Sequence, residues 1–477
     1  MNRENGMEKM MINRKKIKRL PKQKEDLSTV LNGEKQLGNR QKLFLVWQLS
    51  VPAILSQLTS IMMQYIDAAM VGNLGANASA AIGVVSTSTW LLSGLCSAVS
   101  TGFSVQAAQQ IGARKEREAR KVLKHALIAA LGFSILLMLI GVLISRHLPV
   151  WLGAGEEIQK NASGYFLIYS CSLPALQLNS LASSMLQCSG DMRTPAILNA
   201  SMCGLDILFN LIFIHFFGVM GAAIGTALAA LVICAVMLWA ACIRSSVLRI
   251  NRKEPCVYDK MIIQKAIQIG VPMGFEHIAV CGAMIVSTRI VSPLGTIAIA
   301  ANSFAVTAES LCYMPGYGIA AAATAIVGQS LGAGKKRLAK NFSNISILMG
   351  CIVMTAAGVV MYFLCPVIFQ ILTPDIQVQN LAAEVLRIEL FAEPLYAVAI
   401  VASGALRGAG DSFVPSILNL ISIWGVRITI SILLVNQWGL QGVWFAMCVE
   451  LCVRGLLLLY RQQRTFRLKE RKRFWQL

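Results

Sequence analysis

The sequence predicts an all-α polytopic membrane protein with twelve transmembrane helices in two six-helix lobes. The prediction rests on the composition, on recurring apolar spans and on an internal repeat. Of the 477 residues, 56% are hydrophobic and only 14% are charged, and the mean hydropathy is +0.62. A soluble fold of this size would need more polar side chains to cover its surface. The chain is therefore expected to lie in a lipid bilayer.

Apolar spans of about 20 residues, the helix length that crosses a hydrocarbon core, recur between short breaks rich in Gly, Pro, Asn or charge. A transmembrane β-barrel would show short alternating strands instead. The expected helices are residues 43–72, 79–111, 122–146, 161–189, 194–216, 220–243, 264–292, 297–332, 341–371, 380–408, 413–436 and 440–461.

The chain repeats itself at an offset of 220 residues, because Pro52 then aligns with Pro272 and Asn199 aligns with Asn419. Each half holds an even number of helices, so the halves are parallel repeats, and two such lobes with a site between them suit an alternating-access carrier. The expected organisation is a basic cytoplasmic extension (1–42), an N-terminal lobe (43–243), a cytoplasmic linker (244–263), a C-terminal lobe (264–461) and a basic cytoplasmic tail (462–477).

The net charge of +20 comes from Lys and Arg residues that fall almost entirely in segments on one side of the predicted membrane. This asymmetry follows the positive-inside rule and predicts that both termini are cytoplasmic. The basic segments then attract lipid headgroups rather than nucleic acid. Residues 1–42 contain no apolar core followed by a cleavage site, so they are not expected to be a signal peptide.

Common catalytic and metal-binding motifs are absent from the sequence. The 13 cysteines are scattered through apolar spans without a CxxC pair, and the four histidines are dispersed, which favours neither a disulfide framework nor a zinc site. The GQSLGAGK segment at 328–335 lacks the spacing of a phosphate-binding loop. We therefore expect an ion gradient or the membrane potential, rather than ATP, to drive transport.

Acidic residues inside the predicted helices are the main candidates for function, because a carboxylate in hydrocarbon is costly and faces a cavity or a partner. Asp67 lies near the far end of the first helix. Asp206 and Asn210 lie one turn apart on one face of the fifth helix. Together these three residues are expected to hold a proton or a sodium ion, although Asp206 has the alternative of a simple hydrogen bond to a neighbouring helix.

Two acids of the second half are candidates for binding a cationic substrate or a proton. Glu276 follows Pro272 closely, and Glu309 precedes the MPGYG segment, where Pro315 is expected to bend the helix. The alternative for both acids is a structural ion pair with Arg289 or Arg427. Three residues nearer the outer half of the tenth helix are weaker candidates: Glu389, Glu393 and Arg387. Glu450 with Arg454 is expected to be an internal salt pair.

The repeat does not extend to these charges. The aligned pairs are Asp67 with Ser287, Glu276 with Ser56, Glu309 with Thr89, and Asp206 with Val426 or Arg427. A shared scaffold with unshared charges indicates that the two lobes have different roles.

The ordered segments IDAAMVGNLG, QQIGARK, YMPGYG, GQSLGAGKK and GALRGAGDSFVP resemble those of multidrug and toxic compound extrusion (MATE) transporters across residues 43–460. The resemblance implies two six-helix lobes that form a V around a central cavity. It also implies export of cationic, amphipathic compounds in exchange for protons or sodium ions.

Carried over residue by residue, the resemblance makes Asp67 the coupling acid of the first helix and Pro52 the proline that lets this helix bend. Several family members carry an asparagine and then an aspartate in the fifth helix, whereas here Asp206 precedes Asn210. The tenth-helix acid of the sodium-coupled members appears here as Tyr396, with Glu393 nearby, and Glu276 lies one turn before the seventh-helix glutamate of those members.

The leading hypothesis is a secondary-active multidrug antiporter, a monomer in the cell (inner) membrane. Its partners would be small organic cations or drugs and the phospholipid bilayer, and it would need no cofactor other than the coupling ion, H⁺ or Na⁺. The alternatives are a flippase for a lipid-linked precursor, which would favour a more cationic cavity, and a membrane-embedded lipid enzyme, for which no catalytic cluster is evident.

Overall fold

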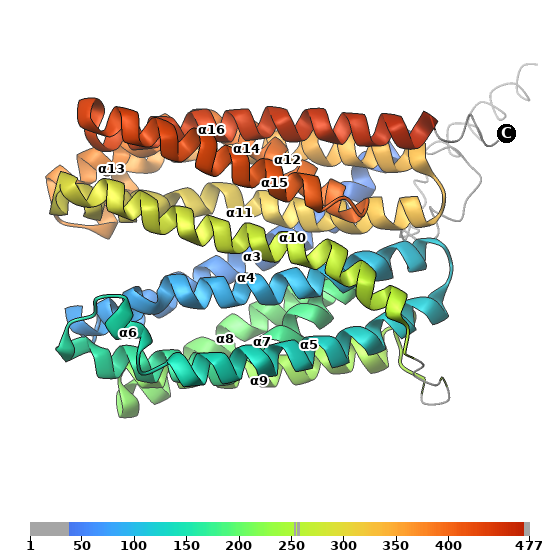
Figure 1. The fold of residues 1–477 in the computed structure, drawn as a ribbon, viewed down its shortest axis with the longest axis horizontal. Coiled ribbons are helices and arrows are strands. Elements are labelled where there is room, and N and C mark those ends of the chain that lie inside the picture. The colour runs from blue at the N-terminus through green and yellow to red at the C-terminus, as the bar shows by residue number, and fades with distance from the viewer. Residues whose placement is uncertain (1–37, 252–253, 255–257, 472–477) are drawn as a thin grey trace, which may run out of the picture.

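The computed structural model describes residues 38–251, 254 and 258–471. This part of the chain folds into helices joined by short turns and contains no strand. The helices run side by side along the long axis of the molecule (Figure 1). Nine of the described helical segments are long and apolar enough to cross a membrane. The protein is thus a multi-pass helical membrane protein, as the sequence predicts.

The N-terminal lobe contains the first six predicted helices and one short helix that was not predicted, α6. Its elements are α3 (Asn39–Gly72), α4 (Ala76–Gly112), α5 (Glu116–Ile144), α6 (Leu148–Trp151), α7 (Glu156–Cys188), α8 (Arg193–Phe217), α9 (Val219–Trp239) and the π-helical turn η1 (Ala240–Arg244). The predicted extension 1–42 lies outside the described residues except at its end, where α3 already begins.

The C-terminal lobe contains the other six predicted helices. Its elements are α10 (Lys260–Val291), η2 (Ser292–Leu294), α11 (Thr296–Gly332), α12 (Lys336–Leu372), α13 (Ile376–Glu389), η3 (Leu390–Ala392), α14 (Glu393–Gly408), α15 (Phe413–Ile421), η4 (Ser422–Ile428) and α16 (Thr429–Arg471).

The C-terminal lobe departs from the predicted spans in two places. The predicted helix 380–408 is broken into α13 and α14 by the 3₁₀ turn η3. The last helix continues to Arg471, beyond its predicted end at 461, so most of the expected tail is helical. Within α16, Gly439 has non-helical dihedral angles (φ 56°, ψ −135°) and marks the boundary between the eleventh and twelfth predicted helices.

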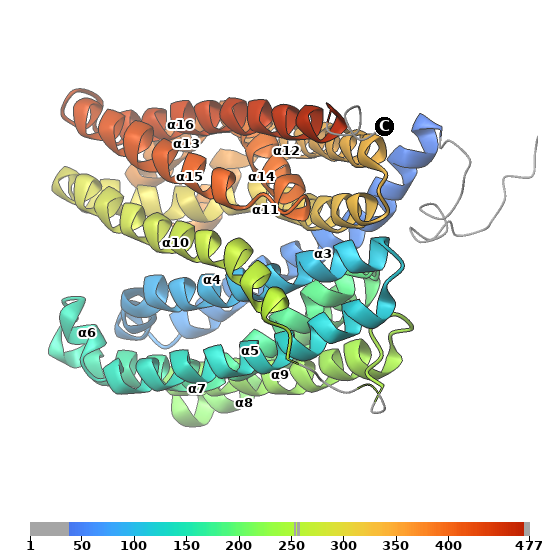
Figure 2. The ribbon, with the colours of Figure 1, turned by 45° about the vertical axis from the view of Figure 1, so that its right-hand side comes forward.

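Helix α11 lies at the centre of the largest core cluster and is rich in buried alanines, including Ala301, Ala305, Ala322 and Ala323. Small side chains let helix backbones approach closely, which is how helices associate in a membrane. In Figure 2 the two lobes lie one above the other, with α11 near the middle. We call the end of the bundle that holds Asn39 and Arg471 the terminal end.

The lobes meet at the terminal end through a symmetric contact between α4 and α11. A Cβ atom added to Gly112 would lie 1.9 Å from the carbonyl oxygen of Gln329, and one added to Gly332 would lie 1.9 Å from that of Gln109. Only glycine fits at such distances. Because these four positions are related by the offset of 220 residues, the contact confirms the internal repeat in three dimensions.

The linker between the lobes is attached to α5 where it is described. Arg120 donates from Nε and Nη2 to the two carboxylate oxygens of Glu254, over 3.3 and 3.0 Å. This pair holds the pKa of Glu254 below its ordinary value. The ring of His125 accepts a hydrogen bond at Nε2 from the backbone N–H of Asp259, 3.0 Å away. These contacts hold the start of α10 against the N-terminal lobe.

Candidate functional site

The structure brings Asp67, Asp206 and Asn210 together inside the N-terminal lobe. The Asn210 amide nitrogen donates to Asp67 Oδ1 over 2.8 Å and to Asp206 Oδ2 over 3.1 Å. One amide therefore bridges two carboxyl groups, one from α3 and one from α8. The shared face of Asp206 and Asn210 that the sequence predicted is observed, because residues one turn apart on a helix are neighbours.

This acidic site is mostly buried, with Asp67 half-buried, and it is incompletely paired. Asp206 and Asn210 have no solvent exposure, and Oδ1 of each residue lacks a hydrogen-bond partner in the described structure. Neither aspartate has a Lys or Arg partner within 4 Å among the described residues. On α9, Gly225 leaves the room that Asn210 occupies, since a Cβ there would lie 2.1 Å from Asn210 Oδ1.

Helix α3 connects this site to the C-terminal lobe. It is continuous from Asn39 to Gly72, through Pro52, and just after Pro52 it contacts the backbone of α11 at Gly318. Two residues before Asp67, the Tyr65 hydroxyl donates to the Thr307 carbonyl oxygen of α11. A movement of α3 would therefore be transmitted to α11.

Glu276 forms a separate site within the C-terminal lobe. Its carboxylate accepts from Ser416 Oγ over 2.7 Å and from Asn419 Nδ2 over 2.6 Å, and Arg407 Nη2 lies 3.5 Å away. The alternative of an ion pair is thus realised with Arg407, and the expected partners, Arg289 and Arg427, were wrong for Glu276. The distant Arg407 on α14 becomes a neighbour only through packing of α10 against α15.

Four glutamates lie buried in the interior of the C-terminal lobe. Glu389, Glu393 and Glu450 have no exposure, and Glu309 is 4% exposed. Both carboxylate oxygens of Glu389 and of Glu393 lack hydrogen-bond partners in the described structure. These two residues flank the η3 break in the tenth predicted helix, so the break carries two unpartnered acids.

Two arginines partly offset this acidic cluster. Arg454 Nε lies 3.1 Å from Glu450 Oε1, which confirms the predicted i, i+4 salt pair. Arg427 and Arg454 both interact electrostatically with Glu309, although no Glu309 ion pair within 4 Å occurs in the described residues. The predicted ion pair of Glu309 with Arg289 or Arg427 is therefore not observed as a direct contact among the described residues.

Tyr396 adjoins the same cluster. Its ring packs edge-on against Tyr313 at 5.6 Å between centroids, and the Arg454 guanidinium lies 5.3 Å above it. Pro272 and Pro315 lie inside continuous helices, α10 and α11. After Pro315, the glycines of MPGYG serve as close contacts, with Gly316 against Met354 and Gly318 against α3.

A family model for MatE matches the chain twice, over residues 52–212 and 272–433. The two matched segments begin 220 residues apart, which is the offset of the internal repeat, and together they cover more than half of the chain. The chain belongs to the MatE family. Its members are the multidrug and toxic compound extrusion transporters that the sequence motifs resemble, so this MatE protein is placed among multidrug efflux transporters.

Curated relatives of this MatE protein match most of its length. A protein of Thermotoga maritima named "Probable multidrug resistance protein NorM" is 25% identical over 421 residues, covering 86% of this chain and 90% of the relative. A Bacillus cereus protein of the same name is 26% identical over 460 residues, covering 91% and 98%. Both relatives are thus named for multidrug resistance.

Solved structures confirm the two-lobe, twelve-helix fold expected for a MatE protein. A MOP superfamily transporter from Pyrococcus furiosus, described as having a binding pocket of reverse polarity that suggests a different function, superposes with a TM-score of 0.86. It is 20% identical, and the match covers 92% of this chain and 100% of that one. An outward-facing multidrug resistance MATE family transporter also gives 0.86 at 20% identity, covering 91% and 99%. At this identity the likeness shows the fold alone.

Sequence reasoning missed Arg407 and Asn419, which surround Glu276 in this MatE protein. It rated Glu389, which belongs to the C-terminal acidic cluster, only as a weaker candidate. The repeat contained a signal for Asn419, because Asn199 and Ser56 occupy the equivalent positions in the N-terminal lobe and form the equivalent hydrogen bond, at 2.6 Å. Nothing in the sequence distinguishes the fully buried Glu389 from an acid near the membrane surface.

Proposed function

We propose that this protein is a secondary-active antiporter that exports amphipathic, often cationic organic compounds in exchange for an inward-moving cation. The observation that carries the proposal is the Asp67–Asn210–Asp206 site, in which Asp206 and Asn210 are buried and Asp67 is half-buried. It has two carboxyl groups, one bridging amide and no arginine or lysine within 4 Å in the described structure. A proton or a metal cation balances such a site, because unpaired buried charges are costly.

The orientation of the Asn210 amide supports protons over sodium as the coupling ion. Sodium, like other hard cations, prefers oxygen ligands. Here the amide nitrogen faces both carboxylates, and Asn210 Oδ1 points elsewhere without a partner. A proton on either aspartate would add a donor that the site lacks, whereas a sodium ion between the two carboxylates would meet the amide nitrogen, which is not a ligand for it.

The proposed cycle uses α3 as the moving element. With the terminal end facing the cytoplasm, a substrate enters the cavity between the lobes, and a proton from outside then binds at Asp67 and Asp206. Neutralising the two aspartates weakens the electrostatic interactions of Asp67 on α3. In response, α3 bends at Pro52, because the proline removes a hydrogen bond from the helix there. Because α3 contacts α11 at Gly318 and through Tyr65, the bend would shift the lobes and release the substrate.

A cationic substrate class is supported by the C-terminal acidic cluster. The number of unpaired glutamates in this cluster exceeds the number of arginines that can balance them, because Arg454 is already paired with Glu450. These glutamates are Glu309, Glu389 and Glu393. Tyr313, Tyr317 and Tyr396 line the same region and offer aromatic faces to a cation. A lipid-flipping role is less well supported, because two of the interior arginines, Arg407 and Arg454, are already paired with glutamates, which leaves Arg427 as a single cation beside several acids.

Ethidium efflux from vesicles with the protein in one orientation tests the proposal. We expect an imposed proton gradient to drive efflux and an imposed sodium gradient not to drive it. Asp67→Asn and Asp206→Asn should each abolish gradient-dependent efflux. Ser287→Ala, at the repeat-related position in the other lobe, is the matched control and should retain it. Full efflux by an Asp67→Asn protein that inserts normally would overturn the proposal, as would efflux that responds to neither gradient.

A further inference from the structure

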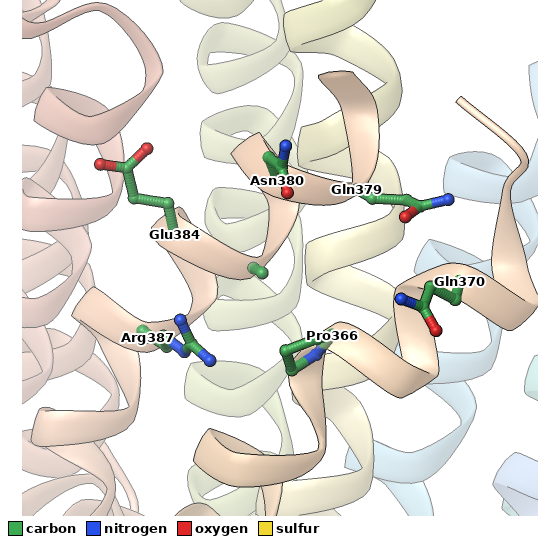
Figure 3. A pocket seen from close by; sticks show the side chains of 7 residues that line it. Pro366, Gln370, Gln379, Asn380, Glu384 and Arg387 are labelled. Atoms are coloured by element: carbon green, nitrogen blue, oxygen red, sulfur yellow. The ribbon is translucent and has the colours of Figure 1, made fainter. Parts of the chain in front are cut away.

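A hollow of about 380 Å³ lies on the outside of the C-terminal lobe, at the end opposite the terminal end. It is formed by the last turns of α12 and by one face of α13. Its lining residues are Pro366, Gln370, Gln379, Asn380, Ala383, Glu384 and Arg387 (Figure 3). It is remote in the fold from the Asp67 site, and neither the antiport mechanism nor the family match assigns it a role.

Arg387 is held in place in this hollow by a defect in α12. Pro366 has no backbone N–H, so the carbonyl oxygen four residues earlier, that of Tyr362, loses its helical partner. Arg387 Nε donates to this oxygen over 3.3 Å, and its guanidinium lies 5.0 Å above the Tyr362 ring. The side chain is thereby fixed from two directions, which leaves its terminal NH₂ groups available to a ligand.

Glu384 supplies a charge of opposite sign at the same hollow. It lies about one turn before Arg387 on α13, with its carboxylate turned away from the guanidinium (Figure 3). No ion pair joins Glu384 to any described residue. The hollow therefore presents one fixed cationic group and one separate anionic group, with the amides of Gln370 and Asn380 beside them.

The surface of α12 below the hollow faces hydrocarbon. Val360, Phe363, Val367 and Ile371 are 56%, 74%, 51% and 80% exposed, which in a membrane protein marks contact with lipid tails. Within the same helix turns, the chain changes to the polar Gln370 and then to the turn before α13. The hollow thus lies where the apolar surface ends, at the depth of the phospholipid headgroups.

From this arrangement we propose that the hollow is a binding site for a zwitterionic aminophospholipid of the adjacent leaflet. The phosphodiester accepts hydrogen bonds from Arg387, the ammonium group contacts Glu384, and the acyl chains lie along Phe363 and Val367. Guanidinium groups bind phosphate oxygens in a fixed, often bidentate geometry. With about 30 Å³ for each water-sized group, the volume has room for about ten non-hydrogen atoms, which a phosphoethanolamine headgroup fits.

The test is lipid binding by the purified full-length chain in detergent micelles, measured by native mass spectrometry. Dioleoyl phosphatidylethanolamine and dioleoyl phosphatidylglycerol are titrated separately. We expect a saturable site that prefers phosphatidylethanolamine. Arg387→Gln should weaken the binding of both lipids about tenfold, as expected for loss of charge-assisted hydrogen bonds. Glu384→Gln should remove the preference for phosphatidylethanolamine. Because this change affects only an exposed side chain, the Glu384→Gln protein should fold normally. It therefore still tests the proposal if the Arg387→Gln protein does not fold.

Arg289→Gln is the matched control, because Arg289 is an exposed arginine near the same end of the bundle, on α10. It should bind both lipids as the unchanged chain does. Glycerophosphoethanolamine, which has the headgroup without acyl chains, should bind far more weakly than the lipid. Equal binding of both lipids by the unchanged chain would overturn the proposal. So would undiminished binding by a folded Arg387→Gln protein, or glycerophosphoethanolamine binding as tight as that of the lipid.

Discussion

Gln109 and Gln329 occupy equivalent positions in the two halves of the chain, and each donates a hydrogen bond across the interface between the lobes. Gln109 Nε2 donates to the Gly408 carbonyl oxygen over 3.2 Å, and Gln329 Nε2 donates to that of Cys188 over 2.7 Å. Gly408 and Cys188 are themselves related by the same offset. The pair therefore forms a symmetric latch that closes the terminal end.

Replacing both glutamines should loosen this latch. Gln→Leu keeps the size of the side chain but removes a hydrogen bond of about 1 kcal/mol at each site, so each single change should favour the open state about fivefold and the double change more. Cys188 is only 4% exposed, so a thiol reagent reaches it only when the terminal end opens. In a background without other reactive cysteines, its maleimide labelling from the terminal side should accelerate accordingly. An unchanged labelling rate in the double variant would contradict the latch, and Gln187→Leu is a neighbouring control.

Gly225 should tolerate no side chain. Gly225→Ala places a Cβ 2.1 Å from Asn210 Oδ1, which forces the amide away from Asp67 and Asp206, and overpacking of this kind costs about 1–3 kcal/mol. We expect proton-driven ethidium efflux to fall about tenfold or more while the protein still inserts. Gly204→Ala is the control, because α8 leaves open space there, and it should transport normally. Normal efflux by Gly225→Ala would show that the amide position is not needed.

The fold was predictable because its determinants are local or repeated. Helix length follows from apolar spans, and two-lobe symmetry follows from matched prolines, glycines and asparagines. The break at η3 has a local cause in Pro394, which lies in the first turn of α14 and has no backbone N–H to continue the preceding helix, but the predicted span 380–408 ran through this proline without a break. The continuation of the last helix to Arg471 was also missed, since its basic, polar sequence resembles a tail.

The candidate sites were predictable only in part. Asp67, Asp206 and Asn210 were grouped correctly because two of them share a helix face and the third is an isolated acid in an apolar span. The partner of Glu276 was not predictable, since Arg407 reaches it through the packing of three helices. Burial is likewise a tertiary property, which is why the unpartnered Glu389 was rated below Glu309.

The contact between Arg120 and Glu254 in the linker should depend on pH. Arg120 lowers the pKa of Glu254 below its ordinary value of 4.5, so the contact stabilises the folded linker fully above pH 4.5 and is lost as the pH falls through the lower, folded pKa. A spin label at Ser246→Cys, an exposed position, should be immobile at neutral pH and gain mobility only under acid. In Glu254→Gln the label should be mobile at every pH; if it stayed immobile, the Arg120 contact would not hold the linker.

Replacing Glu276 and Arg407 together should destabilise the protein less than the two single changes predict. The internal repeat supplies neutral replacements for this test. The counterparts of these two residues in the N-terminal lobe are Ser56 and Gln187, so Glu276→Ser with Arg407→Gln converts the charged pair to the neutral pair that the fold already accepts. Each single change leaves one charge in the membrane with its partner removed, which is strongly destabilising.

The double variant should therefore be more stable than the sum of the single changes predicts, with a coupling energy of about 1–3 kcal/mol between contacting residues. Thermal unfolding in detergent of the four proteins, unchanged, two single and one double, measures this energy. Additive effects would mean that the 3.5 Å approach is not an interaction. Efflux by the double variant then separates the two interpretations of Glu276, because a purely structural pair leaves transport intact whereas a substrate or proton site does not.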